Sequence, residues 1–406
     1  MSRALPLKGI RIVNFGWIWA GPAAGQPLGL LGAEVLKIES HARIDMLRTI
    51  PPFAAGEVGP DRSLTSNACW AGHGSVSLNL KKPEARALAL ELVARSDVVI
   101  ENFGFGVMEK LGLSYEDLCR TKRDIIMLSM PAAGLTGPLK EVRTYGLSLA
   151  SITGLDSLVG YKNGGPIPME SSYTDPLAGI FGAFAVLAAL RYRDNSGQGQ
   201  HVDFSQQEAV AQLVGPAYID YALNGRIGAP KGNEHPVGAA APHGVFPCAG
   251  RDRWISVAVP SEEEWKSLLE AMGQVAWALA ERFSTLGKRL AHIDALHRRF
   301  AEWTAGFDDR KLAATLQSHG VAAAPVLNVA DLLSDPHFVA RKTFIEVKHP
   351  LGYRETIYGA YVKTSHSEVA VEPGPSIGQD NERVLKGLLG ISPKRYAELV
   401  ADGVIF

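Results

Sequence analysis

The sequence predicts an α/β fold, in which a large Rossmann-like domain with a mostly parallel sheet accompanies a smaller α/β domain. Strand-like and helix-like segments alternate over the first 130 residues. The strand-like segments carry adjacent apolar residues, such as IV in GIRIVNF, VL in EVLKIE and IIML in IIMLSM, instead of alternating strictly between polar and apolar positions. Parallel sheets with helices on both faces have this pattern, and their ligands bind at the carboxyl ends of the strands.

The alternation assigns each early segment in turn. GIRIVNF is a strand, about residues 21–32 form a helix, and EVLKIE and SVSLNL are strands. A helix opens at Pro83, because proline suits the first helical position, and VVIENF and IIMLSM follow as strands. The loops after these strands are therefore the places to look for a site.

A long apolar helix follows the sequence ESSYTDP. Asp175 is expected to be its N-cap and Pro176 its first residue, and no further charge occurs before Arg191. On these grounds alone, Asp175 is a capping carboxylate and nothing more. Farther along, residues 225–325 are expected to form a smaller α/β domain, and a stretch rich in Gly, Ala, Pro and His from about Asn224 to Gly250 lies at its start.

Composition excludes several classes of function. Lys and Arg total 41 and Asp and Glu 42, so no global charge attracts nucleic acid or an anionic membrane. The three cysteines are odd in number, widely spaced and typical of reduced thiols. No signal peptide and no membrane span is recognisable, and we expect a soluble, cytoplasmic protein.

Three familiar motifs are incomplete. NFGFGVMEKLG follows a strand, but Glu109 stands where a dinucleotide fingerprint needs its third glycine. GLSLA, residues 146–150, lacks the last glycine of a hydrolase nucleophile elbow and is predicted to be plain helix. The eleven histidines show no metal-type spacing, so no metal site is expected.

Seven segments, in this order and spacing, resemble the family III CoA-transferases, the group that includes formyl-CoA, carnitine and benzylsuccinate CoA-transferases. They are AGPAAGQPLGLLGAEVLKIE, SVSLNLKKPEAR, VVIENFGFGVMEKLGL, GLTGP, YTDPLAGIFGAFAVLAALRYRDNSGQGQHVDFSQQEA, GVAAAPVLNVADLLSDPH and VLKGLLG. The similarity spans nearly the whole chain.

The resemblance implies a particular architecture and chemistry. The large domain would comprise residues 1–200 completed by 330–406, with a linker at 201–224, the small domain at 225–325, and a return linker at the start of 326–406. Two chains would pass through each other as an interlocked dimer. The catalytic nucleophile of the family lies where Asp175 lies, in a D-x-x-x-G context that Gly179 completes, and it forms anhydride and CoA-thioester intermediates. Acyl-CoA is then a substrate, and no permanently bound cofactor is implied.

Carried over by position, the resemblance also implies a CoA site. Phe103 would pack on adenine or pantetheine, and Lys81, Lys110 and Arg143 would bind the phosphates of CoA. Its residues are Trp19, Ala20, Arg43, Leu78, Lys81, Asn102, Phe103, Val107, Lys110 and Arg143.

The chain departs from the family pattern in its first two loops. Ser40 replaces an arginine of formyl-CoA transferases, so phosphate recognition is expected to move to Arg43 or Arg48. Trp17 and Trp19 make the first loop, GWIWAGP, unusually aromatic. This favours a bulky, aromatic acceptor such as benzylsuccinate, with succinyl-CoA as donor. In the alternative interpretation, both tryptophans belong to the core.

Two other functions stay open at this point. An acyl-CoA racemase of the same fold would need an acid/base pair, but residues 140–155 contain no histidine and only Tyr145 could carry a proton. The chain could also be one subunit of a heteromeric CoA-transferase. The predicted partners are acyl-CoA, a free carboxylic acid and a second chain, identical or related.

Overall fold

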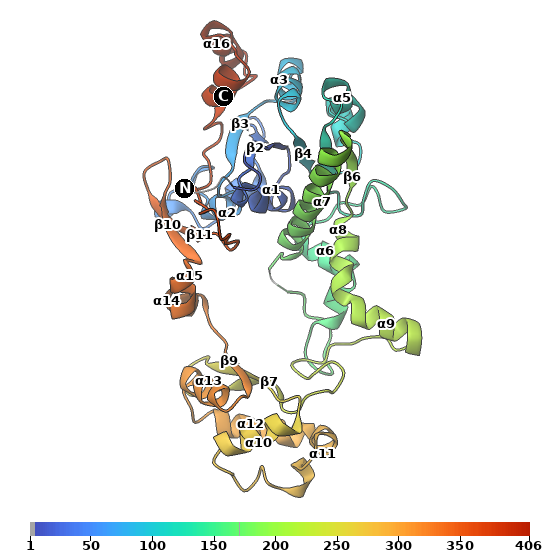
Figure 1. The fold of residues 1–406 in the computed structure, drawn as a ribbon, viewed down its shortest axis with the longest axis vertical. Coiled ribbons are helices and arrows are strands. Elements are labelled where there is room, and N and C mark those ends of the chain that lie inside the picture. Colours follow the sequence, from blue (N-terminus) through green and yellow to red (C-terminus); the bar gives the residue numbers. More distant parts are fainter. Residues whose placement is uncertain (1–4, 170) are drawn as a thin grey trace. The chain divides into compact units, whose positions relative to one another are not determined.

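The computed structural model describes residues 5–169 and 171–406 and divides into two compact units (Figure 1). One unit comprises Met1–Leu155, Met169–Ile219 and Pro336–Phe406. The other comprises Asp156–Pro168 and Asp220–Asp335. Segments from both ends of the chain therefore belong to the first unit.

The first unit is built on a six-stranded parallel sheet of order β3-β2-β1-β4-β5-β6. This confirms the predicted fold class. Because neighbouring connections leave β1 in opposite directions, the loops after β1 and β4 border the crevice where such sheets bind ligands. The strands are β1 (Arg11–Asn14), β2 (Glu34–Glu39), β3 (Gly74–Ser77), β4 (Val98–Glu101), β5 (Ile126–Ser129) and β6 (His201–Asp203).

Helices cover both faces of this sheet, which explains why its strands contain adjacent apolar residues. Val13 and Val99 pack in a core with α3 (Pro83–Ala94) and α5 (Tyr115–Thr121). Their strand neighbours Ile12 and Val98 point to the opposite face, toward α1 (Ala20–Leu30) and α7 (Thr174–Ser196). The helix predicted to open at Pro83 is confirmed.

Helices α1 and α7 pack closely because both carry small residues at their contact. A Cβ atom added to Gly179 would lie 2.6 Å from Cβ of Ala23, so only glycine fits there without a shift. By length and composition alone α7 could cross a membrane, a test that core helices also pass. Its Gly179 and Gly182 are buried instead against α1 and β5.

The predicted start of α7 was wrong. The helix begins at Thr174 and its N-cap is Tyr173, so Asp175 is the second helical residue and Pro176 the third. The helix thus starts two residues earlier than predicted, and the hydroxyl of its first residue, Thr174, donates a 3.0 Å hydrogen bond to the carbonyl of Gly146. Asp175 therefore lies inside the first turn.

The second unit contains an antiparallel sheet of order β7-β8-β9. A hairpin that pairs β10 with β11 belongs to the first unit. The remaining strands are β7 (His243–Pro247), β8 (Trp254–Ala258), β9 (Ala322–Pro325), β10 (Phe344–Lys348) and β11 (Arg354–Tyr358). The remaining helices are α2 (Leu64–Cys69), α4 (Val107–Leu111), α6 (Gly146–Ile152), α8 (Gln206–Ala211), α9 (Gly215–Asn224), α10 (Glu262–Ala271), α11 (Leu286–Ala291), α12 (Ile293–Thr304), α13 (Asp309–Ser318), α14 (Val329–Ser334), α15 (Pro336–Arg341) and α16 (Pro393–Ala401).

Candidate active site

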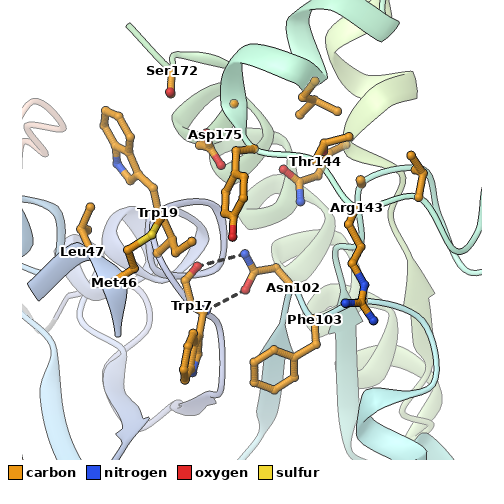
Figure 2. A pocket seen from close by; sticks show the side chains of 18 of the residues that line it. Trp17, Trp19, Met46, Leu47, Asn102, Phe103, Arg143, Thr144, Ser172 and Asp175 are labelled. Carbon is orange, nitrogen blue, oxygen red and sulfur yellow. Dashed lines mark hydrogen bonds between the residues drawn. The ribbon is translucent and has the colours of Figure 1, made fainter. Parts of the chain in front are cut away.

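Two loops meet at the carboxyl edge of the sheet, one after β1 and one after β4. The amide of Asn102, just after β4, bonds both backbone groups of Trp17, just after β1 (Figure 2). The N–H of Trp17 donates to Oδ1 over 2.7 Å, and Nδ2 donates to the carbonyl over 3.0 Å. Asn102 therefore holds the two loops together.

A cavity of about 390 Å³ opens beside these loops and contains Asp175 (Figure 2). Indole, aliphatic and small polar side chains line the cavity. Among the residues that the structure describes, Arg143 is its one cationic lining residue. Its lining residues are Trp17, Ile18, Trp19, Met46, Leu47, Ile50, Thr65, Asn102, Phe103, Gly104, Ala132, Val142, Arg143, Thr144, Tyr145, Gly146, Leu149, Ser172, Asp175 and Gln206.

Asp175 is partly buried, and burial raises its pKa from 3.8 to about 6. Its own backbone amide acts in the opposite direction, but more weakly. Desolvation therefore outweighs the favourable effect of the helix N-terminus on the ionised form. Above pH 7 the carboxylate is still mostly ionised, and it is more basic than an exposed aspartate.

The backbone of Gly146 forms the wall behind Asp175. A Cβ atom added there would lie 2.5 Å from Oδ2 of Asp175 and 2.4 Å from Cβ of Ser172. Gly146 is the first residue of α6, so the GLSLA segment is plain helix as predicted. The absence of a side chain at this position is what lets α6 approach the carboxylate.

A second cavity, of about 460 Å³, shares part of its lining with the first. The guanidinium of Arg43 lies 4.4 Å from the ring centre of Trp17, which in turn meets the Phe103 ring edge-on. Its lining residues are Phe15, Trp17, Ile38, Glu39, Ser40, Ala42, Arg43, Leu78, Asn79, Leu80, Lys81, Asn102, Phe103, Gly104, Val107, Leu111, Arg143 and Tyr145. Arg43, Lys81 and Arg143 make this cavity basic, which suits an anionic ligand.

Most residues proposed from the sequence line one of these cavities. Asp175 and Trp19 line the first, Arg43, Leu78, Lys81 and Val107 line the second, and Asn102, Phe103 and Arg143 line both. Two do not line either cavity: Ala20 is buried as the first residue of α1, and Lys110 is exposed on α4.

Arg48 was a wrong candidate for phosphate recognition. Its side chain is fully buried and makes two 2.7 Å bonds to the carboxylate of Glu39. It also bonds Asp61 and the carbonyl of Pro375. A guanidinium satisfied in this way has no donor left for a ligand, so Arg43 is the cation that this loop offers.

The two tryptophans of the first loop are half-buried, and both line the first cavity. In Figure 2 the Trp17 ring lies near Phe103, and the Trp19 ring extends to the opposite side of the loop. Both tryptophans therefore line the cavity, and they are not residues of the hydrophobic core alone.

Sequence reasoning missed several lining residues. Met46 and Ile50 follow β2, a position that the rule of strand ends could have selected, but the length of that loop hides which residues turn inward. Thr65 and Ser172 lie outside the seven family segments, and Gln206 lies within the fifth of them but has no feature that singles it out. Tertiary packing alone brings them to Asp175.

No cluster of three or more His, Cys, Asp or Glu residues suited to a metal occurs in the described residues. Cys69, Cys119 and Cys248 are free thiols.

Comparison with known families decides the classification. The sequence model of CoA-transferase family III matches residues 7–381. The chain belongs to CoA-transferase family III. As a CoA-transferase, it uses an acyl-CoA thioester and a carboxylic acid as substrates.

Relatives of this CoA-transferase align over nearly their entire length. The succinyl-CoA–D-citramalate CoA-transferase of Chloroflexus aurantiacus is 32% identical over 405 residues, which cover 98% of each chain. The alpha subunit of succinyl-CoA–L-malate CoA-transferase from Chloroflexus aurantiacus is also 32% identical, over 99% of this chain and 93% of the relative. The crystal structure of a CAIB/BAIF family protein from Brucella suis superimposes with a TM-score of 0.85 at 29% identity, covering 95% of this chain and 100% of the other.

Proposed function

We propose that this CoA-transferase moves CoA from succinyl-CoA to an acceptor acid through covalent intermediates on Asp175. The observation that carries the proposal is the position of Asp175, a partly buried carboxylate in the wall of a cavity that adjoins a basic one. Both relatives described above are named for succinyl-CoA, which supports the choice of donor.

The second cavity has the chemistry that coenzyme A requires. Arg43, Lys81 and Arg143 would pair with its phosphates, and Phe103 offers a ring for adenine or pantetheine. Residues shared by both cavities, such as Asn102, provide a path by which the pantetheine arm reaches Asp175. Ala20 and Lys110 line neither cavity.

In the proposed reaction, the Asp175 carboxylate attacks the thioester carbonyl, the C–S bond breaks, and CoA leaves as a thiolate. The mixed anhydride left on Asp175 is attacked at its aspartyl carbonyl by that thiolate, which releases succinate and forms an aspartyl-CoA thioester. The acceptor carboxylate attacks this thioester and expels the thiolate again. The thiolate then attacks the acceptor carbonyl of the second anhydride, giving product acyl-CoA and free Asp175, with no net proton change.

Each intermediate would react with water, so the cavity has to exclude it. The indoles of Trp17 and Trp19, with Met46 and Leu149, supply an apolar lining around the carboxylate. Burial among them also raises the pKa of Asp175 to about 6, which makes the ionised form a stronger nucleophile than a solvated aspartate.

We infer a bulky, aromatic acceptor acid, such as a benzylsuccinate-like compound. The support is the lining of the first cavity by Trp17, Trp19 and Tyr145, with Arg143 available for a second carboxylate. The relatives named for D-citramalate and L-malate represent the competing class of small hydroxylated diacids. Competition between benzylsuccinate, D-citramalate and L-malate for one donor discriminates the classes, and a clear preference for either hydroxy acid would contradict the inference.

We infer further that two interlocked chains form the active enzyme, in the cytoplasm. Helix α7, which carries Asp175, exposes Ile180 and Phe184 with 54% and 71% of their surface accessible, an apolar face suited to a second chain. One relative is named as an alpha subunit, which supports a related chain, and not only an identical one, as the second chain. Native mass spectrometry of the purified chain, alone and with related subunits, distinguishes a homodimer from a heteromer.

The covalent route is tested by incubating the enzyme with succinyl-CoA and trapping adducts with hydroxylamine or borohydride. We expect a mass change confined to the peptide containing Asp175 and absent from Asp175→Ala. Deuterium exchange next to a branched acyl thioester, without any trapped adduct, would instead assign the chain to the racemase branch, with Tyr145 as a candidate proton carrier. If activity appears only after a related chain is added, the heteromeric form is the functional one.

The pH dependence follows from the pKa of Asp175. Because the ionised carboxylate is the nucleophile, kcat/KM is expected to be level above about pH 7 and to fall about tenfold per unit well below pH 6. A pH–rate profile from pH 4.5 to 8, with circular dichroism at each pH to show that the enzyme stays folded, measures this. A level profile down to pH 5 would contradict the raised pKa.

A further inference from the structure

In the loop between β1 and α1, side chains bond the backbone N–H and the backbone carbonyl of each of the residues 16–18. Gly16 donates to Oδ1 of Asn14 over 2.8 Å and accepts from Nζ of Lys37 over 2.8 Å. Trp17 makes its two bonds to Asn102. A loop satisfied in this way has little freedom to rearrange, although loops of this type are usually the most mobile part of a fold.

Ile18, the third of these residues, has a φ of 59°, in the left-handed region. Branched side chains disfavour this conformation strongly, and an isoleucine there is a genuine outlier. Strained backbone of this kind persists only where the surroundings impose it, and it gathers at functional sites. The strain therefore has to be balanced by specific contacts to Ile18.

Two buried side chains hold the Ile18 backbone from opposite ends. Its N–H donates to both oxygens of Asp45, at 3.0 and 3.2 Å. Its carbonyl accepts from the indole Nε1 of Trp70, at 3.1 Å. We call Asp45 and Trp70 the Ile18 clamp.

Lys37 joins the two halves of the Ile18 clamp. Its ammonium lies 3.0 Å from Oδ2 of Asp45 and 4.4 Å from the ring centre of Trp70. Lys37, Asp45 and Trp70 are 0%, 3% and 0% exposed. A buried ion pair is weak evidence for stability, since apolar residues of similar size often serve the fold as well or better. The pair is better explained by the conformation that it imposes.

We propose that Asp45 and Trp70 are positioning residues that hold Ile18 in its left-handed conformation and thereby fix Trp17 and Trp19 in the walls of the cavity beside Asp175. Release of Ile18 to a negative φ would rotate the peptide planes on both sides of it. Trp17, which lines both cavities, and Trp19, which lines the first, would then leave their positions. The effect on catalysis rests on the proposed function, whereas the effect on the loop does not.

The most conservative test is Trp70→Phe. It keeps an aromatic ring beside Lys37 and Arg48, makes this buried side chain smaller, and removes the N–H that bonds Ile18. With 5-fluorotryptophan incorporated, the ¹⁹F signals of Trp17 and Trp19, assigned through their Phe variants, are expected to shift or broaden while the other indole signals stay in place. For CoA transfer to the acceptor acid, kcat/KM should fall about tenfold, with the melting temperature changed by only a few degrees.

The matched control is Trp254→Phe. The indole of Trp254 donates a 2.8 Å bond to Asp252, whose own φ of 54° is also left-handed, but Trp254 lines neither cavity. This variant also removes an indole hydrogen bond to a residue with a left-handed φ, although the acceptor is the Asp252 carboxylate and the Trp254 ring is 38% exposed. It should leave the Trp17 and Trp19 signals and kcat/KM unchanged.

A double-mutant cycle separates positioning from a general loss of structure. In an Ile18→Gly background the left-handed conformation has no steric penalty, so Trp70→Phe should reduce kcat/KM by less than it does in the wild type. If Trp70→Phe does not fold, Asp45→Asn is the second probe, and it should move the same two ¹⁹F signals.

Unchanged Trp17 and Trp19 signals in both variants, or an equal loss of kcat/KM in both backgrounds, would overturn the proposal. If the wild-type enzyme transfers CoA to no acid, the ¹⁹F measurement still decides whether the Ile18 clamp exists, and only the proposed function fails.

Discussion

Asp175→Asn is expected to lower kcat/KM for CoA transfer by about 10⁴-fold or more, because an amide cannot form the acyl anhydride or the CoA thioester. Asparagine has nearly the shape of aspartate, so its contact with Gly146 is retained and the cavity keeps its form. Steady-state kinetics with succinyl-CoA, together with the trapping experiment, measures the effect. Residual activity within about tenfold of wild type would exclude Asp175 as the nucleophile.

The matched control for this variant lies on the same helix. Asp194 is exposed near the end of α7 and lines neither cavity, so Asp194→Asn makes the same chemical change away from the site. It should retain wild-type kcat/KM. Equal losses in both variants would show that the integrity of α7, and not the chemistry of Asp175, was being measured.

Asp175→Asn should also be more stable than the wild type near pH 8. The pKa of Asp175 is about 6 in the folded state and about 3.8 when solvated, so the folded chain binds more protons between these values. Stability therefore falls as pH rises through that window, and the cost is fully present above it. Urea denaturation at pH 5 and pH 8 should show the advantage of asparagine growing with pH.

Gly146→Ala is the second change with a large expected effect. The new methyl group would lie 2.4 Å from Ser172 and 2.5 Å from the Asp175 carboxylate, so α6 or the start of α7 has to move. Displacement of a nucleophile by about 1 Å can cost about 10²-fold in rate, and we expect a loss of that order in kcat. Pre-steady-state acylation by succinyl-CoA measures the step directly.

Gly287→Ala is the control for Gly146→Ala. Gly287 also lies in the first turn of a short helix, α11, without a positive φ, and a Cβ there meets nothing within 4 Å. Alanine should be neutral or stabilise the protein by about 0.5–1 kcal/mol, with unchanged kinetics. Wild-type acylation by Gly146→Ala would show that the Asp175 carboxylate is not held by this contact.

Much of the fold was predictable because it depends on local pattern. Strands β1, β2, β4 and β5 are buried on both faces, so each contains adjacent apolar residues, a pattern that indicates a parallel sheet. The loops at the site were predictable for the same reason, since the strand ends locate them. Trp19, Asn102 and Phe103 occur where those loops leave β1 and β4.

Local pattern failed where distant parts of the chain meet. Arg48 has the sequence context of a surface cation, but it is buried against Glu39 and bonds Pro375, which is 327 residues away. Asp175 was predicted to cap α7, yet the helix starts two residues earlier than predicted, at Thr174, whose hydroxyl bonds Gly146.

The sequence by itself determined the parallel α/β architecture, the loops that border the site and, through the order of its motifs, the family. Only the tertiary structure decided the raised pKa of Asp175, the close contact with Gly146 and the left-handed conformation of Ile18. Strand periodicity is a property of neighbouring residues and can be seen in one segment. Desolvation, steric contact and a backbone held against its own preference depend on what other segments place there.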